Sequence, residues 1–103
     1  MALRDDPVYA ISVAARLCEM HPQTLRLYER LGLVKPNRTD SRNRLYSEVD
    51  IERLRQIRRL TADLRINLAG VEVIFNLLDQ MEEARGEMQA EIDRLRLELE
   101  RRS

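Results

Sequence analysis

Apolar and polar positions over residues 12–32 predict two short helices joined by a tight turn. Ser12 can cap a first helix that begins at Val13, because its side chain can accept a hydrogen bond from a free backbone N–H. Pro22 suits the first turn of a second helix, where its missing N–H costs nothing, and Gly32 suits the end of that helix. This pattern is a helix-turn-helix candidate, although an ordinary helical hairpin has the same pattern.

Residues 34–46 predict a short two-stranded hairpin. Pro36 opposes a continuous helix here, and the turn residues at 39–41 favour a reversal of the chain. A basic hairpin directly after a helix-turn-helix is typical of a wing that reaches phosphates or a minor groove. A solvated loop is the alternative, but it less often carries four basic residues against one acidic residue. The basic residues of the hairpin are Lys35, Arg38, Arg42 and Arg44.

Residues 47–78 repeat the helical pattern twice. Ser47, with Asp50 three residues later, has the spacing of a capping box and predicts a third helix over residues 48–61. Asn67 can cap a fourth helix, whose apolar residues again recur at helical spacing. We interpret both apolar stripes as parts of a hydrophobic core.

From residue 78 the apolar positions follow a heptad repeat, which is typical of a coiled coil. Residues 81–101, if helical, span roughly 30 Å and have no core of their own to pack on. We therefore predict that this helix pairs with a second chain; packing back onto helices three and four is the alternative. Arg85 beside Gly86 weakens the seam, so we expect extra dimer contacts from helix four. The predicted dimerisation residues are Leu78, Met81, Met88, Ile92, Leu95 and Leu99.

The predicted fold is mainly α, a winged helix-turn-helix followed by a dimerising coiled-coil helix. The predicted regions are an N-terminal arm (1–9), a winged helix-turn-helix DNA-binding domain (10–67), and helix four with the C-terminal dimerisation helix (68–103). The formal net charge of the 103 residues is zero, but residues 1–67 carry 13 basic and 9 acidic groups, and the remainder 5 and 9. This asymmetry suggests a basic half that binds nucleic acid and an acidic half with another task.

Several classes of protein are disfavoured by the sequence. The single cysteine, Cys18, cannot form an internal disulfide, and with His21 it offers too few ligands for a structural zinc site. No apolar run is long enough for a membrane span and no signal peptide is evident, so a cytoplasmic, nucleoid-associated protein without membrane contact is expected. An enzyme is disfavoured because no nucleophile and base can be paired, and no cofactor or metal is expected.

Four motifs follow each other along the chain: Ile11-Ser12-Val13-Ala14-Ala15, the run from Thr24 to Pro36, Arg44-Leu45-Tyr46, and Asp50-Ile51-Glu52-Arg53-Leu54. Together they resemble the MerR family, which has a winged helix-turn-helix followed by a dimerising helix. The resemblance covers residues 10–80. Within the family, the segments Met20–Arg26 and Asn67–Val71 look most like those of the heat-shock repressors, often called HspR. The family usually has Gly where Glu19 stands and an aromatic residue where Leu27 stands, so we expect a strained or altered turn at Glu19.

The resemblance implies that the second helix enters the major groove of DNA. Arg can form a bidentate contact with guanine and Gln with adenine, whereas a Tyr hydroxyl can donate to phosphate. Tyr28 resembles the family's phosphate-contacting tyrosine, and an inward-packed core ring is the alternative. The DNA-binding residues implied are His21, Gln23, Thr24, Arg26 and Tyr28 on the helix, and Arg38, Arg42, Asn43, Arg44 and Tyr46 on the wing.

The subgroup resemblance implies a homodimeric repressor of heat-shock and chaperone genes that binds an inverted repeat in double-stranded DNA, with the DnaK chaperone as a possible co-repressor. One alternative is a MerR-type activator that distorts promoter DNA. The other is a protein-interaction adaptor built on the coiled coil, with the helix-turn-helix as a scaffold.

Overall fold

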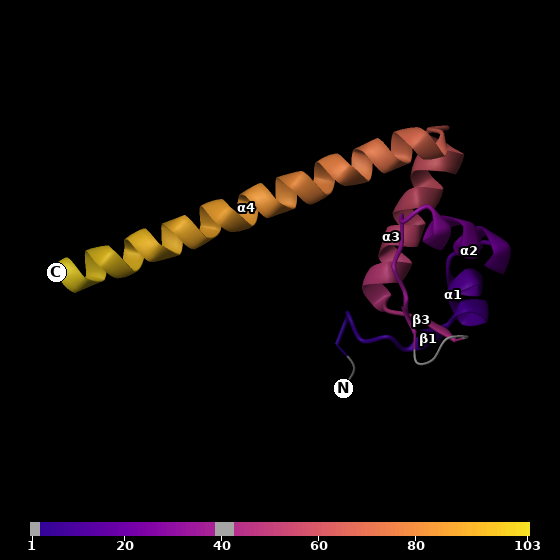
Figure 1. Cartoon of the computed structure of the whole chain (residues 1–103), viewed down its shortest axis with the longest axis horizontal. Coiled ribbons are helices and arrows are strands. Elements are labelled where there is room, and N and C mark those ends of the chain that lie inside the picture. Colours follow the sequence, from indigo (N-terminus) through magenta and orange to yellow (C-terminus); the bar gives the residue numbers. More distant parts are fainter. Residues whose placement is uncertain (1–2, 39–42) are drawn as a thin grey trace. The chain divides into compact units, whose positions relative to one another are not determined.

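The structure is a computed structural model that describes residues 3–38 and 43–103 (Figure 1). Its contacts divide the chain into two units, Met1–Val71 and Glu72–Ser103. The division falls close to the domain boundary predicted after residue 67. Within the described residues, no helix has the length and apolar character that a membrane span requires.

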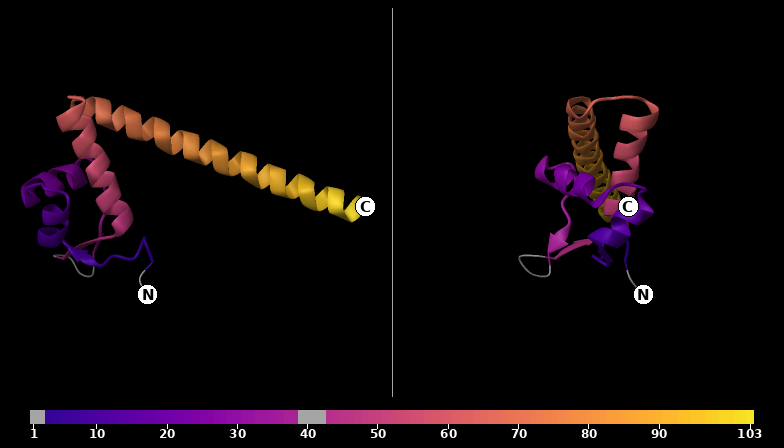
Figure 2. Two further views of the ribbon diagram at one scale, coloured as in Figure 1. Left: turned by 180° about the vertical axis from the view of Figure 1, so that it is seen from behind. Right: turned by 90° about the vertical axis from the view of Figure 1, so that its right-hand side faces the viewer.

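Short helices and strands make up the first unit, and one long helix runs from its last residues through the second unit (Figures 1 and 2). A π-helical segment, η1, directly follows the third helix. The elements are β1 (Tyr9–Ala10), α1 (Ile11–Leu17), α2 (Pro22–Arg30), β2 (Asn37–Arg38), β3 (Arg44–Tyr46), α3 (Glu48–Arg58), η1 (Arg59–Asp63) and α4 (Leu68–Arg102).

The sheet has three antiparallel strands in the order β1-β3-β2. Strands β2 and β3 pair with Arg38 opposite Arg44, which confirms the predicted hairpin. Strand β1 was not expected, because residues 1–9 were predicted only as an arm. Tyr9 pairs with Tyr46, and the N–H of Val8 donates to the Tyr46 carbonyl at 3.1 Å. The end of the arm is therefore part of the sheet.

Helix α1 begins two residues earlier than predicted, and the cap assigned to Ser12 is wrong. The N-cap is Ala10, which has an extended backbone and makes no side-chain cap. Because Ala10 is also the last residue of β1, the strand leads directly into the helix. Helix α2 begins with Pro22 as predicted, and Gly32 follows its end with φ of +76°.

The start of α3 confirms the predicted capping box. The N–H of Asp50 donates to Ser47 Oγ at 3.1 Å, and the N–H of Ser47 donates to Asp50 Oδ2 at 2.9 Å. The regular helix ends at Arg58, and η1 carries the chain on past the predicted end at residue 61. Asn67 precedes α4 as predicted, and its Oδ1 accepts the N–H of Gly70 at 2.8 Å. Helix α4 then continues for 35 residues, so the predicted helix four and C-terminal helix are one helix.

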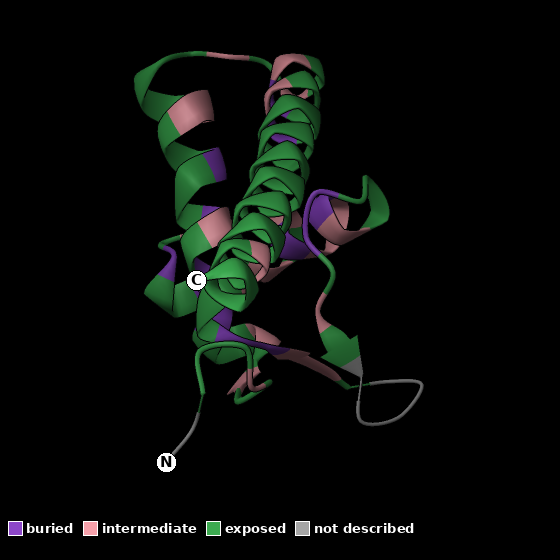
Figure 3. Ribbon diagram, turned by 90° about the vertical axis from the view of Figure 1, so that its left-hand side faces the viewer, coloured by how far each residue is buried: buried purple, intermediate pink, exposed green. Residues whose placement is uncertain are grey.

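A small hydrophobic core lies where α1, α2, α3 and β3 meet (Figure 3). Apolar residues at helical spacing predict most of this core. The same spacing includes Leu31 and Leu60, but Leu31 is 45% exposed and Leu60 is half-buried. The buried apolar residues of the first unit are Ala14, Ala15, Cys18, Leu25, Tyr28, Leu33, Val34, Tyr46, Ile51, Leu54, Ile57 and Val71.

The turn between α1 and α2 is strained at Glu19, whose φ is +55°. Left-handed backbone costs a residue with a Cβ atom roughly 1 kcal/mol, and glycine avoids this cost. Two arginines of α3 hold the turn: Arg58 donates to the Glu19 carboxylate at 2.8 Å, and Arg55 donates to the Leu17 carbonyl at 3.2 Å. The altered turn expected from the sequence is confirmed.

We predict that Glu19→Gly is more stable than Glu19→Gln by about 1 kcal/mol, measured as the free energy of unfolding in urea. Both variants lose the exposed ion pair with Arg58, so their difference isolates the backbone strain. A Glu19→Gly protein that is no more stable than Glu19→Gln would show that the turn carries no strain.

A candidate nucleic-acid interface

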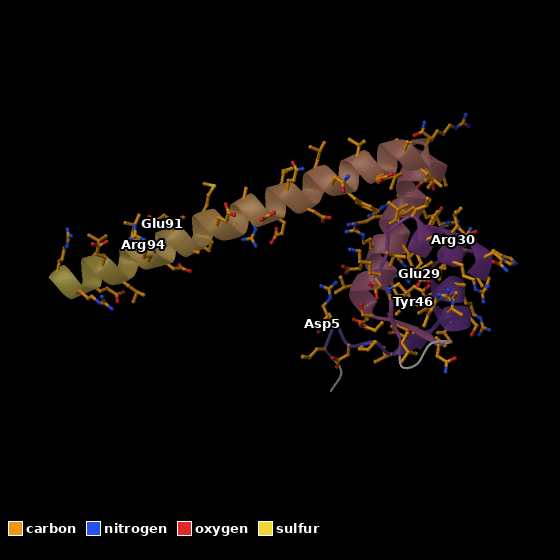
Figure 4. The ribbon with its side chains drawn as sticks, in the orientation of Figure 1. Asp5, Glu29, Arg30, Tyr46, Glu91 and Arg94 are labelled. Carbon is orange, nitrogen blue, oxygen red and sulfur yellow. The ribbon has the colours of Figure 1, made fainter. Side chains whose placement is uncertain are left out.

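Helix α2 has one face in the core and a polar face opposite it. Leu25 is fully buried and Tyr28 is 7% exposed. Gln23, Arg26 and Arg30 follow each other at spacings of three and four residues and lie on the opposite side of the helix. Gln23 and Arg30 are exposed and Arg26 is half-buried (Figure 4 labels Arg30). This polar face carries two of the predicted DNA-binding residues.

The start of α2 is fixed by His21. The N–H of Gln23 donates to His21 Nδ1 at 3.1 Å, so the ring caps the helix. Because Nδ1 accepts this hydrogen bond, it carries no proton, and Nε2 is the atom that remains to donate to another group. His21 is exposed and Thr24 is half-buried. The helix dipole makes this end favourable for a negatively charged group such as a phosphate.

Tyr28 packs its ring into the core. Burial raises the pKa of its hydroxyl, and a hydrogen bond with the Thr61 side chain opposes part of that rise. In this structure, which contains no DNA, the Tyr28 ring is therefore packed inward, as in the alternative to a phosphate contact given above. Its role as a phosphate contact stays a prediction.

The wing residues differ in what they can reach. Asn43 is exposed, whereas Arg44 donates from Nε to Glu29 Oε2 of α2. Tyr46 is fully buried, and its hydroxyl makes no hydrogen bond with the described residues. Burial raises the pKa of Tyr46 to about 12, and the charge of Glu29 adds to that rise. Of the three predicted DNA contacts on the wing whose side chains the structure describes, Asn43 is exposed, Arg44 is half-buried and Tyr46 is buried.

Two predicted wing contacts cannot be placed. The side chain of Arg38 and the whole of Arg42 lie outside the described residues. Their roles stay predictions.

The DNA-binding residues predicted from the sequence do not include Arg30, which shares the polar face of α2. It lies four residues after Arg26 and seven after Gln23, so helical periodicity alone places all three on one face. The predicted contacts were placed near the start of the helix, whereas Arg30 is its last residue.

The second unit presents an apolar stripe along α4. All six predicted dimerisation residues are exposed, with exposed fractions from 41% at Ile92 to 67% at Met88 and Leu99. At the polar seam position, Arg85 forms a double hydrogen bond with Glu82 one turn earlier, at 2.5 and 3.0 Å. An apolar stripe of this length on one chain is typical of a helix that pairs with another.

The sequence pattern of the MerR HTH family of regulatory proteins matches residues 9–78. The chain belongs to the MerR family. A protein named heat shock protein HspR from Streptomyces coelicolor is 58% identical over 79 residues, which are 77% of this chain and 52% of that protein. The HTH-type regulator MlrA of Salmonella typhimurium is 40% identical over 67% of this chain and 28% of its own length. This MerR-family chain thus spans about half of the HspR relative and less of MlrA.

The fold of the MerR-family chain also matches a solved structure. The transcription regulator PbrR691 from Ralstonia metallidurans CH34, in complex with lead(II), aligns with a TM-score of 0.65 and 31% identity. The alignment covers 90% of this chain and 76% of PbrR691. MlrA and PbrR691 are named as transcription regulators and not as enzymes, in agreement with the sequence prediction. Resemblance to the family and to HspR is confirmed.

We predict that the protein loses stability at alkaline pH, because the core beneath α2 holds three protonated groups. Burial raises the pKa of the Cys18 thiol above 9.0, and the pKa values of Tyr28 and Tyr46 are raised above 10.0. A raised pKa in the folded state adds stability below the unfolded pKa, and this contribution is lost as the pH rises through the folded value. Urea unfolding from about pH 8 to about pH 11 measures the fall.

Cys18→Ala is the control for this prediction. It removes the first group to titrate, so its free energy of unfolding should begin to fall at a higher pH than that of the unmodified chain. A free energy of unfolding that stays constant or rises up to about pH 11 would contradict the assignment of these groups.

Proposed function

We propose that this chain is a sequence-specific DNA-binding transcription regulator that acts as a homodimer and represses heat-shock genes. The observation that carries the proposal is the exposed polar face of α2, held outward by the buried Leu25 and Tyr28 in a chain of the MerR family. The similarity to HspR supports the class of target genes. A co-repressor such as DnaK is part of this proposal as a further partner.

The side chains of α2 suit two kinds of contact with DNA, one with base edges and one with phosphates. Arg26 has the planar fork that matches the O6 and N7 atoms of guanine, and Gln23 has the amide that matches adenine. His21 and Thr24 lie at the helix start, where contacts to phosphate fix the register without reading sequence. Arg30 lies at the other end of the same face and offers a further phosphate contact.

The stripe on α4 supports pairing with a second copy in the antiparallel direction. In a parallel pair in register, the two Arg85 side chains face each other in the seam, which is unfavourable for like charges. In an antiparallel pair that places Leu78 opposite Leu95, Arg85 faces Met88 instead. The same register places Met81 opposite Ile92, so the remaining layers are apolar on both sides. Arg85 thus disfavours the parallel dimer.

Repression is favoured over activation by the resemblance of the sequence to the heat-shock repressor subgroup, and an activator that distorts promoter DNA is the second candidate. A dimer with a two-fold axis predicts an inverted-repeat operator with half-sites on one face of the duplex. Transcription in vitro from a promoter that contains the operator separates the two, because a repressor lowers transcript yield and an activator raises it.

The proposal is tested by fluorescence anisotropy with an inverted-repeat fragment from upstream of a DnaK operon, beside a scrambled duplex and a salt series. Specific binding at least about a thousandfold tighter than binding to the scrambled duplex, with a steep salt dependence, is the expected result. Equal, weak binding to both duplexes would overturn the heat-shock assignment. Absence of any salt-sensitive binding would favour an adaptor built on the coiled coil.

We predict that Arg26→Ala reduces the preference for the operator by about tenfold or more, because one bidentate base contact contributes roughly 1–3 kcal/mol of discrimination. Arg101→Ala, which removes an exposed arginine near the end of α4, is the matched control and should bind as the unmodified chain does. Circular dichroism checks that both variants are folded. An unchanged preference in Arg26→Ala would show that this face of α2 does not read bases.

We predict that Arg85→Leu strengthens the dimer but loosens its orientation. An apolar seam position stabilises pairing in either direction, so the melting temperature should rise by about 5 °C. Orientation is measured with Ser103→Cys in a Cys18→Ala background, since a disulfide forms only where two C-terminal ends meet. Little disulfide is expected with Arg85 present and more with Arg85→Leu. Efficient disulfide formation with Arg85 present would contradict the antiparallel pairing.

A further inference from the structure

The wing strand β3 and helix α2 are joined by an ion pair between residues that are 15 positions apart. Arg44 donates from Nε to Glu29 Oε2, and the two side chains are 23% and 16% exposed. The ion pair at the turn, between Arg58 and Glu19, is 48% and 71% exposed. Ions that are withdrawn from solvent are screened less by salt, and losing either partner leaves the other poorly solvated. The pair is therefore a firmer link than the surface pairs.

Tyr46 lies beside this ion pair. It follows Arg44 by two residues on β3, so both side chains are on the same face of the strand. The negative charge of Glu29 acts on its hydroxyl and the positive charge of Arg44 opposes this effect, so all three groups are close in space. Figure 4 shows Glu29 and Tyr46 together where α2 and β3 meet. The ion pair therefore borders the hydrophobic core on one side and not solvent.

This environment changes what Arg44 can contribute to DNA binding. Its charge is already balanced by a carboxylate, so moving it to a phosphate would leave Glu29 half-buried without this cation. A phosphate near the pair would also meet the charge of Glu29. The sequence implied that Arg44 contacts DNA, but its contacts in the structure favour a different role.

We propose that Arg44 is a positioning residue whose ion pair with Glu29 fixes the angle between the wing and helix α2. The proposal rests on the DNA-binding function proposed above. The wing needs such a link because its strands are short, with two residues in β2 and three in β3. A helix in the major groove and a wing at the neighbouring backbone must fit one duplex together, so a fixed angle lowers the entropy lost on binding.

Salt dependence separates positioning from phosphate contact. The slope of log K against log salt falls by roughly 1 for each phosphate contact that is removed. Operator and scrambled duplexes are titrated over a salt series with Glu29→Gln, Arg44→Gln, Arg44→Lys and the double variant Glu29→Gln with Arg44→Gln. Arg30→Gln is the matched contrast, since it removes an exposed arginine from the same helix as Glu29.

Positioning predicts that Glu29→Gln and Arg44→Gln each weaken operator binding by about tenfold, with an unchanged salt slope and unchanged binding to the scrambled duplex. The double variant should be no weaker than either single variant, because both remove the same link. Arg44→Lys keeps the charge and should recover part of the loss. Arg30→Gln should reduce the slope by about 1 on both duplexes.

Two results would overturn the positioning role alone. One is a salt slope that falls by about 1 in Arg44→Gln while Glu29→Gln binds as tightly as the unmodified chain or tighter, which is the signature of a phosphate contact. The other is operator binding that is unchanged in both single variants. If the unmodified chain shows no preference for its operator, the proposed function fails and the positioning role fails with it.

Loss of folding must be separated from loss of positioning. Urea unfolding of each variant gives its folded fraction, and binding constants are corrected for that fraction. The charge-exchanged double variant Glu29→Arg with Arg44→Glu restores an ion pair in the same place. Recovery of operator binding above that of the single variants supports positioning, and a further loss in a folded protein contradicts it.

Discussion

A nine-residue helix is not stable by itself in water, so α2 depends on the core beneath it. Leu25 and Tyr28 supply the apolar contact, and their burial decides which side chains remain outside. The orientation of the polar face is therefore a consequence of packing. Any change that rotates α2 would therefore also turn the polar face that carries Gln23 and Arg26.

Helix α3 acts as the frame for this arrangement. Its buried residues Ile51, Leu54 and Ile57 form one side of the core, and its arginines reach the turn that precedes α2. The Cys18 thiol lies 3.9 Å from the Ile51 carbonyl, so the turn also contacts the backbone of α3. Other elements thus contact α2 at both ends. Helix α3 binds the turn before it, and Arg44 of the wing binds Glu29 near its last residue.

The sequence predicted features that depend on neighbouring residues. Pro22, Gly32 and the Ser47–Asp50 capping box each act over a few positions, and the structure has them where they were expected. Features that depend on distant residues were missed. Strand β1 forms only because β3 offers a free edge, and no signal in residues 1–10 reveals that edge. The pairing of Arg44 with Glu29 was missed for the same reason, since a basic wing alone suggests contact with phosphate.

Strand β3 is the last strand in the sequence but the middle strand of the sheet, with β1 and β2 on its two sides. Both edges of β3 are therefore occupied, and the open edges of the sheet belong to β1 and β2, which have only two residues each. The order of synthesis has a further consequence. Residues Tyr9 and Ala10 emerge from the ribosome long before Arg44–Tyr46, so the sheet cannot close until the wing has been made. Until then, β1 has no strand to pair with.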